Sequence, residues 1–142
     1  MISYPKVALL VCMAAFSAAS LANSSTSLLG TWVGKSNTAV MGDAKHHVKA
    51  NGNDTRFVVT ELKLVIEKEQ GRNFSGYLIS NSDKEQIAGA FMSDMINGVF
   101  VDSDGSVTFK RTGQDRLEAC YVHNPSATTS SSLASCTDFQ RQ

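Results

Sequence analysis

The feature that most constrains the fold is an alternation of apolar and polar side chains that repeats every two residues. Leu62, Leu64 and Ile66 fall on one side of this alternation, while Lys63 and Glu67 fall on the other. The same spacing recurs at Phe74, Gly76 and Leu78, at Ile87, Gly89 and Phe91, at Val107 and Phe109, at Leu117, Ala119 and Tyr121, and at Leu133 and Phe139. Because successive side chains of a β-strand point to opposite faces, the pattern predicts an all-β protein.

Short polar segments separate the alternating stretches. Residues favoured in tight turns gather at 69–72, 81–83, 97–98, 102–105 and 112–115. Successive hairpins of this kind predict an antiparallel meander. Residues 41–56 and 124–132 are too long and polar for hairpin turns, so we expect two longer loops there. A helix over residues 85–95 is the alternative on propensity, but the apolar spacing and the central Gly89 favour a strand.

The alternating stretches are best satisfied by a closed sheet. Each strand has one apolar face to bury, and a sheet that closes on itself also removes exposed strand edges. The sequence therefore predicts a single antiparallel up-and-down β-barrel of about seven or eight strands. We assign this domain to residues 23–142.

The first 22 residues have the organisation of a secretory signal peptide. Lys6 precedes an apolar run over residues 7–16, and small residues then lead to Ser20-Leu21-Ala22. The apolar run is shorter than the ~20 residues that a membrane span needs. We expect cleavage after Ala22 and a periplasmic or secreted protein that is not inserted in a membrane.

Two cysteines remain after the predicted cleavage. Cys12 lies within the signal segment, which leaves Cys120 and Cys136 as an even pair in an oxidising compartment. The pair lacks the CxxC spacing of a metal-binding or redox-active site. We therefore predict a disulfide that joins the last two strands on the face opposite Tyr121 and Phe139.

Charge and motifs argue against several functional classes. Lys6 is the only charged residue of the first 22, so residues 23–142 contain 12 basic and 13 acidic side chains and no charged run. A nucleic-acid partner would require a basic surface that neutralises phosphates, so none is expected. The sequence has no Gly-x-Ser-x-Gly motif, and it suggests no catalytic group and no cofactor.

The remaining polar clusters have simpler interpretations. Asp43, His46, His47 and His123 are the candidate metal ligands, but neighbouring side chains of an extended chain point apart, which favours solvated histidines. Residues 102–105 begin like a calcium loop without its later ligands and are expected to form a hairpin turn. Glu67 and Glu69 share a predicted strand face and are expected to project into solvent.

The segment Leu28-Leu29-Gly30-Thr31-Trp32-Val33-Gly34 resembles the first strand of the calycin group of barrels, the lipocalins and avidins, which carries a Gly-x-Trp signature. Phe74-Ser75-Gly76-Tyr77 and Ile87-Ala88-Gly89-Ala90 are similar to later avidin strands in the placement of glycine. The chain also resembles small exported bacterial proteins of uncharacterised function.

The resemblance implies structural roles for two residues. In such barrels the tryptophan closes one end of the interior and an arginine from a late strand packs over its ring. Trp32 is the equivalent tryptophan, Arg141 is our first choice for the arginine, and Arg116 is the second. Avidins carry several tryptophans and a polar contact at the position of Gly34, so biotin binding is not expected here.

Two functions follow as hypotheses. The first is an exported binding protein that holds a small, partly apolar ligand at the barrel mouth, under the predicted 41–56 loop. Glycines on inward faces would leave room for the ligand, and Tyr77, Phe91, Phe109 and Tyr121 are the candidate lining residues. The alternative is a protein-interaction or inhibitor module with a filled barrel that acts on an envelope or extracellular partner.

Overall fold

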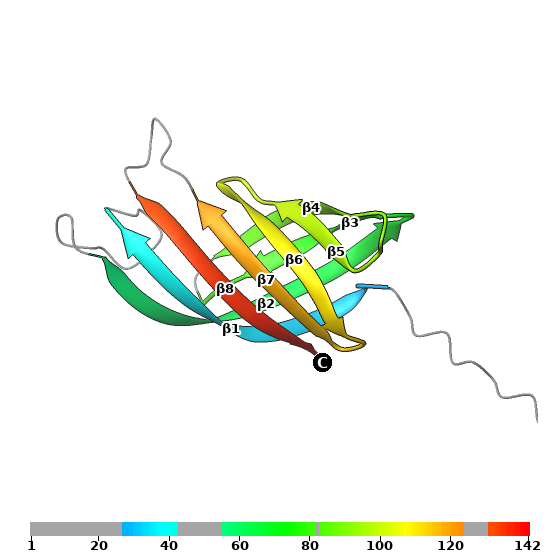
Figure 1. Cartoon of the computed structure of the whole chain (residues 1–142), viewed down its shortest axis with the longest axis horizontal. Coiled ribbons are helices and arrows are strands. Elements are labelled where there is room, and N and C mark those ends of the chain that lie inside the picture. The colour runs from blue at the N-terminus through cyan, green and yellow to red at the C-terminus, as the bar shows by residue number, and fades with distance from the viewer. Residues whose placement is uncertain (1–26, 43–54, 82, 124–130) are drawn as a thin grey trace, which may run out of the picture.

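A computed structural model describes residues 27–42, 55–81, 83–123 and 131–142. These residues form a closed antiparallel barrel of eight strands, in which each strand pairs with the next and the last pairs with the first (Figure 1). The strands are β1 (Gly30–Met41), β2 (Arg56–Gln70), β3 (Asn73–Ile79), β4 (Lys84–Phe91), β5 (Asn97–Val101), β6 (Gly105–Gly113), β7 (Arg116–His123) and β8 (Ser132–Arg141). The all-β fold and the up-and-down barrel predicted from the alternation are confirmed.

Several sequence-based expectations concern residues outside those described. The predicted signal peptide over residues 1–22 lies there, as do residues 43–54 and 124–130 of the two predicted loops. Asp43, His46 and His47 of the candidate metal ligands belong to the first of these loops. The described part of the chain contains no helix that is long and apolar enough to span a membrane.

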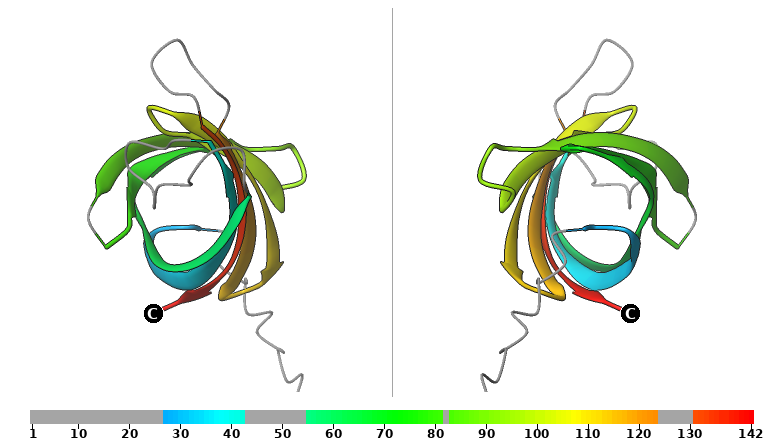
Figure 2. Two further views of the ribbon diagram at one scale, coloured as in Figure 1. Left: turned by 90° about the vertical axis from the view of Figure 1, so that its left-hand side faces the viewer. Right: turned by 90° about the vertical axis from the view of Figure 1, so that its right-hand side faces the viewer.

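Figure 2 shows the barrel from both ends of its long axis. Its strands are strongly staggered relative to one another. Thr38 of β1 pairs directly with Val58 of β2. Paired residues can also be followed from Thr38 the other way round the barrel, from β8 back to β3, and this path ends at Glu69 of β2 instead of Val58. It passes through Ser135, Tyr121, Val107, Phe100, Gly89 and Phe74. Such an offset between the two paths is required when tilted strands close into a barrel.

The wall of the barrel is not equally long on all sides. β1, β2 and β8 have 12, 15 and 10 residues, whereas β3, β4 and β5 have 7, 8 and 5. Pairing between β2 and β3 stops at Lys63 and Ile79, so residues 56–62 of β2 pair with β1 but with no residue of β3. We call the end reached by these residues the loop end, and the end with the β2–β3, β4–β5 and β6–β7 turns the closed end.

Inward glycines allow close packing rather than open space. A Cβ built on Gly89 would lie 2.3 Å from the ring of Phe74, and one on Gly98 would lie 2.3 Å from the ring of Phe109. At Gly105 the ring of Tyr121 takes the equivalent position, at 2.6 Å. The sequence-based expectation that inward glycines leave room for a ligand is therefore wrong at Gly89, because an aromatic ring from the neighbouring strand fills the space.

One local prediction, the turn at Asn97 and Gly98, is also corrected. Asn97 and Gly98 do not form a turn; they begin β5, and the turn precedes them. Asp94 organises it by accepting hydrogen bonds from the backbone N–H groups of Asn97 and Ile96, both at 2.9 Å, and these bonds lower the pKa of its carboxyl. The segment considered as an alternative helix contains β4 and this turn.

A β-bulge changes the face on which Glu69 lies. The register between β2 and β3 shifts between Ile66 and Lys68, and such an extra residue reverses the alternation that follows it. Glu67 is exposed, but Glu69 pairs with the inward Phe74 and accepts a hydrogen bond from the Ser27 hydroxyl at 2.7 Å. The prediction that Glu67 and Glu69 project together into solvent is therefore wrong for Glu69.

Candidate functional site

The closed end of the barrel is filled by an apolar core. Phenylalanines from four strands meet there edge to face, with ring centroids 5.4 to 6.3 Å apart among Phe74, Phe91, Phe100 and Phe109. Trp32 is fully buried in the same cluster, together with Leu28, Leu64, Ile66, Ile87, Val107, Leu117, Ala119 and Phe139. Edge-to-face rings at these spacings pack closely, so this half of the interior is solid.

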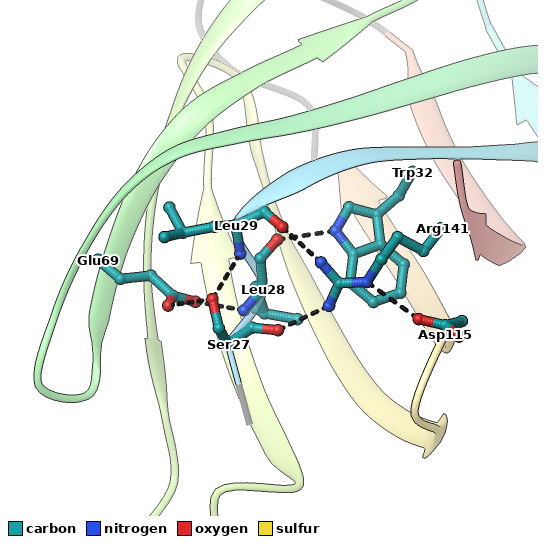
Figure 3. Close-up of polar contacts among 7 residues, drawn as sticks. All are labelled: Ser27, Leu28, Leu29, Trp32, Glu69, Asp115 and Arg141. Atoms are coloured by element: carbon teal, nitrogen blue, oxygen red, sulfur yellow. Dashed lines mark hydrogen bonds and ion pairs between the residues drawn. The ribbon is translucent and has the colours of Figure 1, made fainter. Parts of the chain in front are cut away.

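Trp32 closes this end under a guanidinium group (Figure 3). The Arg141 guanidinium carbon lies 4.1 Å from the centroid of the Trp32 ring, and the indole N–H donates to the Leu28 carbonyl at 2.8 Å. Arg141 also donates to the carbonyls of Ser27 and Leu29 and pairs with Asp115 at 3.2 Å. One side chain thus holds the segment before β1 and the β6–β7 turn against the indole.

Arg116, the second choice for this role, is exposed and belongs to the outer face of β7. The Cys120–Cys136 disulfide is present on the same outer face. The two residues are directly paired across β7 and β8, with Cα atoms 4.1 Å apart. The predicted bridge between the last two strands is confirmed.

The four aromatic residues predicted to line a ligand site do not come together. Phe91 and Phe109 lie within the closed-end core, and the Arg111 guanidinium carbon is 5.5 Å from the Phe91 ring. Tyr77 alternates with the buried Phe74 and Gly76 and faces outward, where the Lys84 ammonium group lies 3.7 Å from its ring. Only Tyr121 reaches the loop-end half of the interior.

The loop-end half of the barrel has a polar lining. Five polar side chains are buried among the described residues, namely Ser36, His123, Ser131, Ser135 and Thr137. Thr38 extends this set, with its hydroxyl oxygen 3.2 Å from that of Ser36. Thr137 lies near the middle of β8, and the others lie on or next to the loop-end halves of β1, β7 and β8. The sequence carries a weak signal for this set, because Ser36 shares the parity of Trp32, and Ser135 and Thr137 share that of Phe139; it was not predicted.

Tyr121 lies at the boundary between the two halves. It packs both against the closed-end core and against the buried pair Val40 and Leu133 near the loop end. Its environment raises the pKa of the Tyr121 hydroxyl, first because burial disfavours the phenolate and second because the carboxylates of Asp102, Glu85 and Asp104 are close. Tyr121 is therefore a neutral phenol that faces acidic groups at the barrel mouth.

Asp102 lies in the β5–β6 turn and is also close to Tyr121 at the barrel mouth. Its Oδ1 accepts hydrogen bonds from the backbone N–H groups of Asp104 and Gly105, at 3.0 and 2.7 Å. Its Oδ2 is buried without a hydrogen-bond partner in the described structure. The predicted hairpin at residues 102–105 is confirmed.

The outer surface contains two further features. A groove of about 520 Å³ runs over β1, β2 and the end of β3, beside Lys35, Glu61, Lys63 and Ile79. Near the loop end, Phe57 and Val59 project from the outer face of β2 with 83% and 64% of their surface exposed. Met41 at the end of β1 is half exposed as well. Large apolar side chains this exposed are uncommon in such number at one place.

Comparison of the chain with protein-family models, curated protein sequences and solved structures finds no match. Across the described residues, no group of three or more His, Cys, Asp or Glu side chains is placed to hold a metal ion.

Proposed function

We propose that the protein is an exported binding protein that holds a small, partly apolar ligand in the loop-end half of its barrel. The observation that carries this proposal is the division of the interior into a solid apolar half and a half lined by hydroxyl and ionisable groups. Val40 and Leu133 add an apolar surface within the polar half. Ligand pockets commonly combine apolar walls with a few polar groups that fix orientation.

The polar lining is difficult to explain as packing alone. Burying a polar group costs free energy unless it is hydrogen-bonded, and a filled apolar interior would stabilise the barrel more simply. A buried ionisable side chain whose pKa is strongly shifted is a candidate for a functional site, and Tyr121 is such a group. The first-strand resemblance to calycins, which bind small molecules inside such barrels, supports the same function.

An external compartment is part of the proposal. The disulfide supports an oxidising environment, since such bonds persist mainly outside the cytoplasm. The segment over residues 1–22 supports export, because a basic residue, an apolar run and small residues follow one another as in a signal peptide.

The proposal is tested by native mass spectrometry of protein purified from its host, together with a thermal-shift screen of lipids and pigments. We expect a bound species or a stabilising compound. We also expect Tyr121→Phe to weaken binding and Tyr77→Phe to leave it unchanged, because only the first hydroxyl faces the interior. Absence of any bound species and of any stabilising compound would contradict the proposal.

The exposed apolar residues Met41, Phe57 and Val59 favour a second candidate function, a protein-interaction or inhibitor module. Val59 and Phe57 lie on the part of β2 that extends beyond β3, beside the loop end. A photo-crosslinking residue at position 57, introduced in the host, should then give a discrete crosslinked species. The matched control is position 99, because Val99 is also exposed but lies on β5; equal crosslinking at both positions would argue against this function.

A further inference from the structure

Residues 56–62 of β2 form an open strand edge at the loop end. They pair with β1 on one side, whereas pairing with β3 on the other side begins only at Lys63. Within the described part of the chain, no other strand takes the place next to this edge. The backbone N–H and C=O groups of such an edge are a template on which a further strand can pair.

The outward side chains of this edge are apolar at its free end. Phe57 and Val59 are 83% and 64% exposed. The next outward residue, Glu61, is paired across the strands with Lys35 of β1, so its charge is balanced within the same wall. Residues 56–60 therefore present no charged side chain on the outer face of the barrel.

The edge also lacks the features that usually keep edge strands from associating. Charged side chains, proline and bulges serve this purpose in many proteins. The segment contains no proline, and the β-bulge of β2 comes after it, where β3 already pairs. By contrast, the part of β4 that extends beyond its pairing with β5 is short and begins with Lys84 and Glu85. The β2 edge is thus the one suited to a partner strand.

This edge is complementary to a second copy of itself. When two copies run antiparallel with Val58 opposite Val58, Phe57 of each copy faces Val59 of the other. Pairs of an aromatic and a β-branched side chain stabilise neighbouring antiparallel strands. The arrangement makes this pair twice, and it covers the two most exposed large apolar side chains of the described structure.

Charge and space are compatible with the same register. Arg56 faces Thr60 of the second copy, so like charges do not meet across the pairing. Thr60 is also the last paired residue, which leaves Glu61 and Leu62 between the second copy and Lys63, where β3 begins to pair. Residues 23–142 contain 12 basic and 13 acidic side chains, so two copies do not repel each other strongly.

We propose that two copies of this chain associate through their open β2 edges, with Phe57 of each opposite Val59 of the other. Four apolar side chains and two strand edges would be covered, on the order of 1,000 Å² in total, which is the lower end of the range for specific interfaces. We therefore expect a dimer that dissociates on dilution. The inference goes beyond ligand binding and assigns these residues to a second copy rather than to an unrelated partner.

Sedimentation equilibrium of the purified protein, at concentrations up to about 0.5 mM, tests for the dimer. The mean mass should increase with concentration toward that of two chains. Val59→Lys adds a charge at the edge and removes an apolar contact from each copy, so it should weaken association by about tenfold or more. Val99→Lys is the matched control, because Val99 is also exposed but its strand, β5, pairs on both sides.

Disulfide trapping tests the register. A Phe57→Cys variant mixed with a Val59→Cys variant under mild oxidation should form a bond between chains faster than either variant alone. Directly opposite residues of antiparallel strands lie within reach of a disulfide, whereas two cysteines at the same position of both copies would be diagonal neighbours. Circular dichroism establishes that each variant is folded.

The outcomes decide between a second copy and another partner. A protein that stays monomeric at every concentration overturns the proposal, as does a folded Val59→Lys variant that dimerises as strongly as the wild type. Equal bond formation in the mixture and in the separate variants overturns it as well. If crosslinking at position 57 in the host captures only a different protein, the edge belongs to that protein. None of these results changes the test for ligand binding, which uses the thermal-shift screen.

Discussion

At the scale of single residues, Arg141 links more of the closed end than any other side chain described. It covers the Trp32 ring, donates to two carbonyls of the segment before β1 and pairs with Asp115. The sequence predicted its packing on Trp32 through the calycin resemblance. Its hydrogen bonds to Ser27 and Leu29 depend on where the chain enters β1, which the spacing of residues does not specify.

Replacement of Arg141 by Met should therefore destabilise the barrel. The loss of a cation over a ring and of donors to two carbonyls predicts a decrease of about 1–3 kcal/mol in the free energy of unfolding. Because the protein contains one tryptophan, the emission of Trp32 should shift to longer wavelength as this end loosens. Chemical denaturation monitored by fluorescence measures both effects. Arg116→Met is the control, and an equal loss there would contradict the role of Arg141.

Tyr121 should make the protein less stable in alkali. Its pKa is raised in the folded protein by burial and by nearby carboxylates, whereas an unfolded tyrosine ionises near pH ~10. As the pH rises above that value, the unfolded state loses the proton first, so this contribution to the free energy of unfolding decreases. Denaturation between pH 9 and 11 should show a smaller decrease in Tyr121→Phe than in the wild type or Tyr77→Phe. Identical pH dependence in all three proteins would refute this.

At the scale of strands, alternation predicted which residues face inward but not how they fill the space. Glycine on an inward face has two interpretations, open room or a neighbour's ring, and the sequence alone does not choose between them. In the structure Phe74, Phe109 and Tyr121 cover Gly89, Gly98 and Gly105. The β4–β5 turn was also missed, because Asp94 acts through side-chain hydrogen bonds and Met95 adopts a positive φ of 57° without glycine.

Gly89→Ala tests the contact between an inward glycine and a ring. The added Cβ would lie 2.3 Å from Phe74 and 2.7 Å from the Phe100 Cβ, so the core must rearrange. Overpacking of this kind costs about 1–3 kcal/mol of the free energy of unfolding. Gly113→Ala is the matched control, since its new Cβ would meet no atom closer than 3.6 Å. A Gly89→Ala variant as stable as Gly113→Ala would show that the ring is not tightly held.

At the scale of the whole molecule, the closed barrel follows from the alternation and the turn residues, both of which can be recognised in the sequence. Eight alternating segments with turn residues between them leave few other ways to bury one face of each strand. The stagger of the strands and the polar half of the interior could not be predicted in this way. Ser36, Ser135 and Thr137 are common residue types, and only the register reveals that they share one region with Tyr121.

The disulfide should stabilise this closed wall as a unit. Cys120 and Cys136 bridge β7 and β8 directly, and a loop of 16 residues between bonded cysteines corresponds to about 3 kcal/mol on the chain-entropy model. Cys120→Ser with Cys136→Ser should therefore lower the denaturation midpoint, and reduction of the wild-type protein should lower it to a similar value. A midpoint that does not respond to a reducing agent would contradict this.

The unequal lengths of the strands make the rim at the loop end lower on one side of the barrel than on the other. β3, β4 and β5 end well before β8, β1 and β2, so the rim is lowest on the side opposite β1. In the described structure, the acidic residues Glu85 and Asp102 lie on this lower side, near the β3–β4 and β5–β6 turns. For the binding function proposed above, these carboxylates would repel an approaching anion and slow its association, whereas a neutral or cationic solute would not be held back.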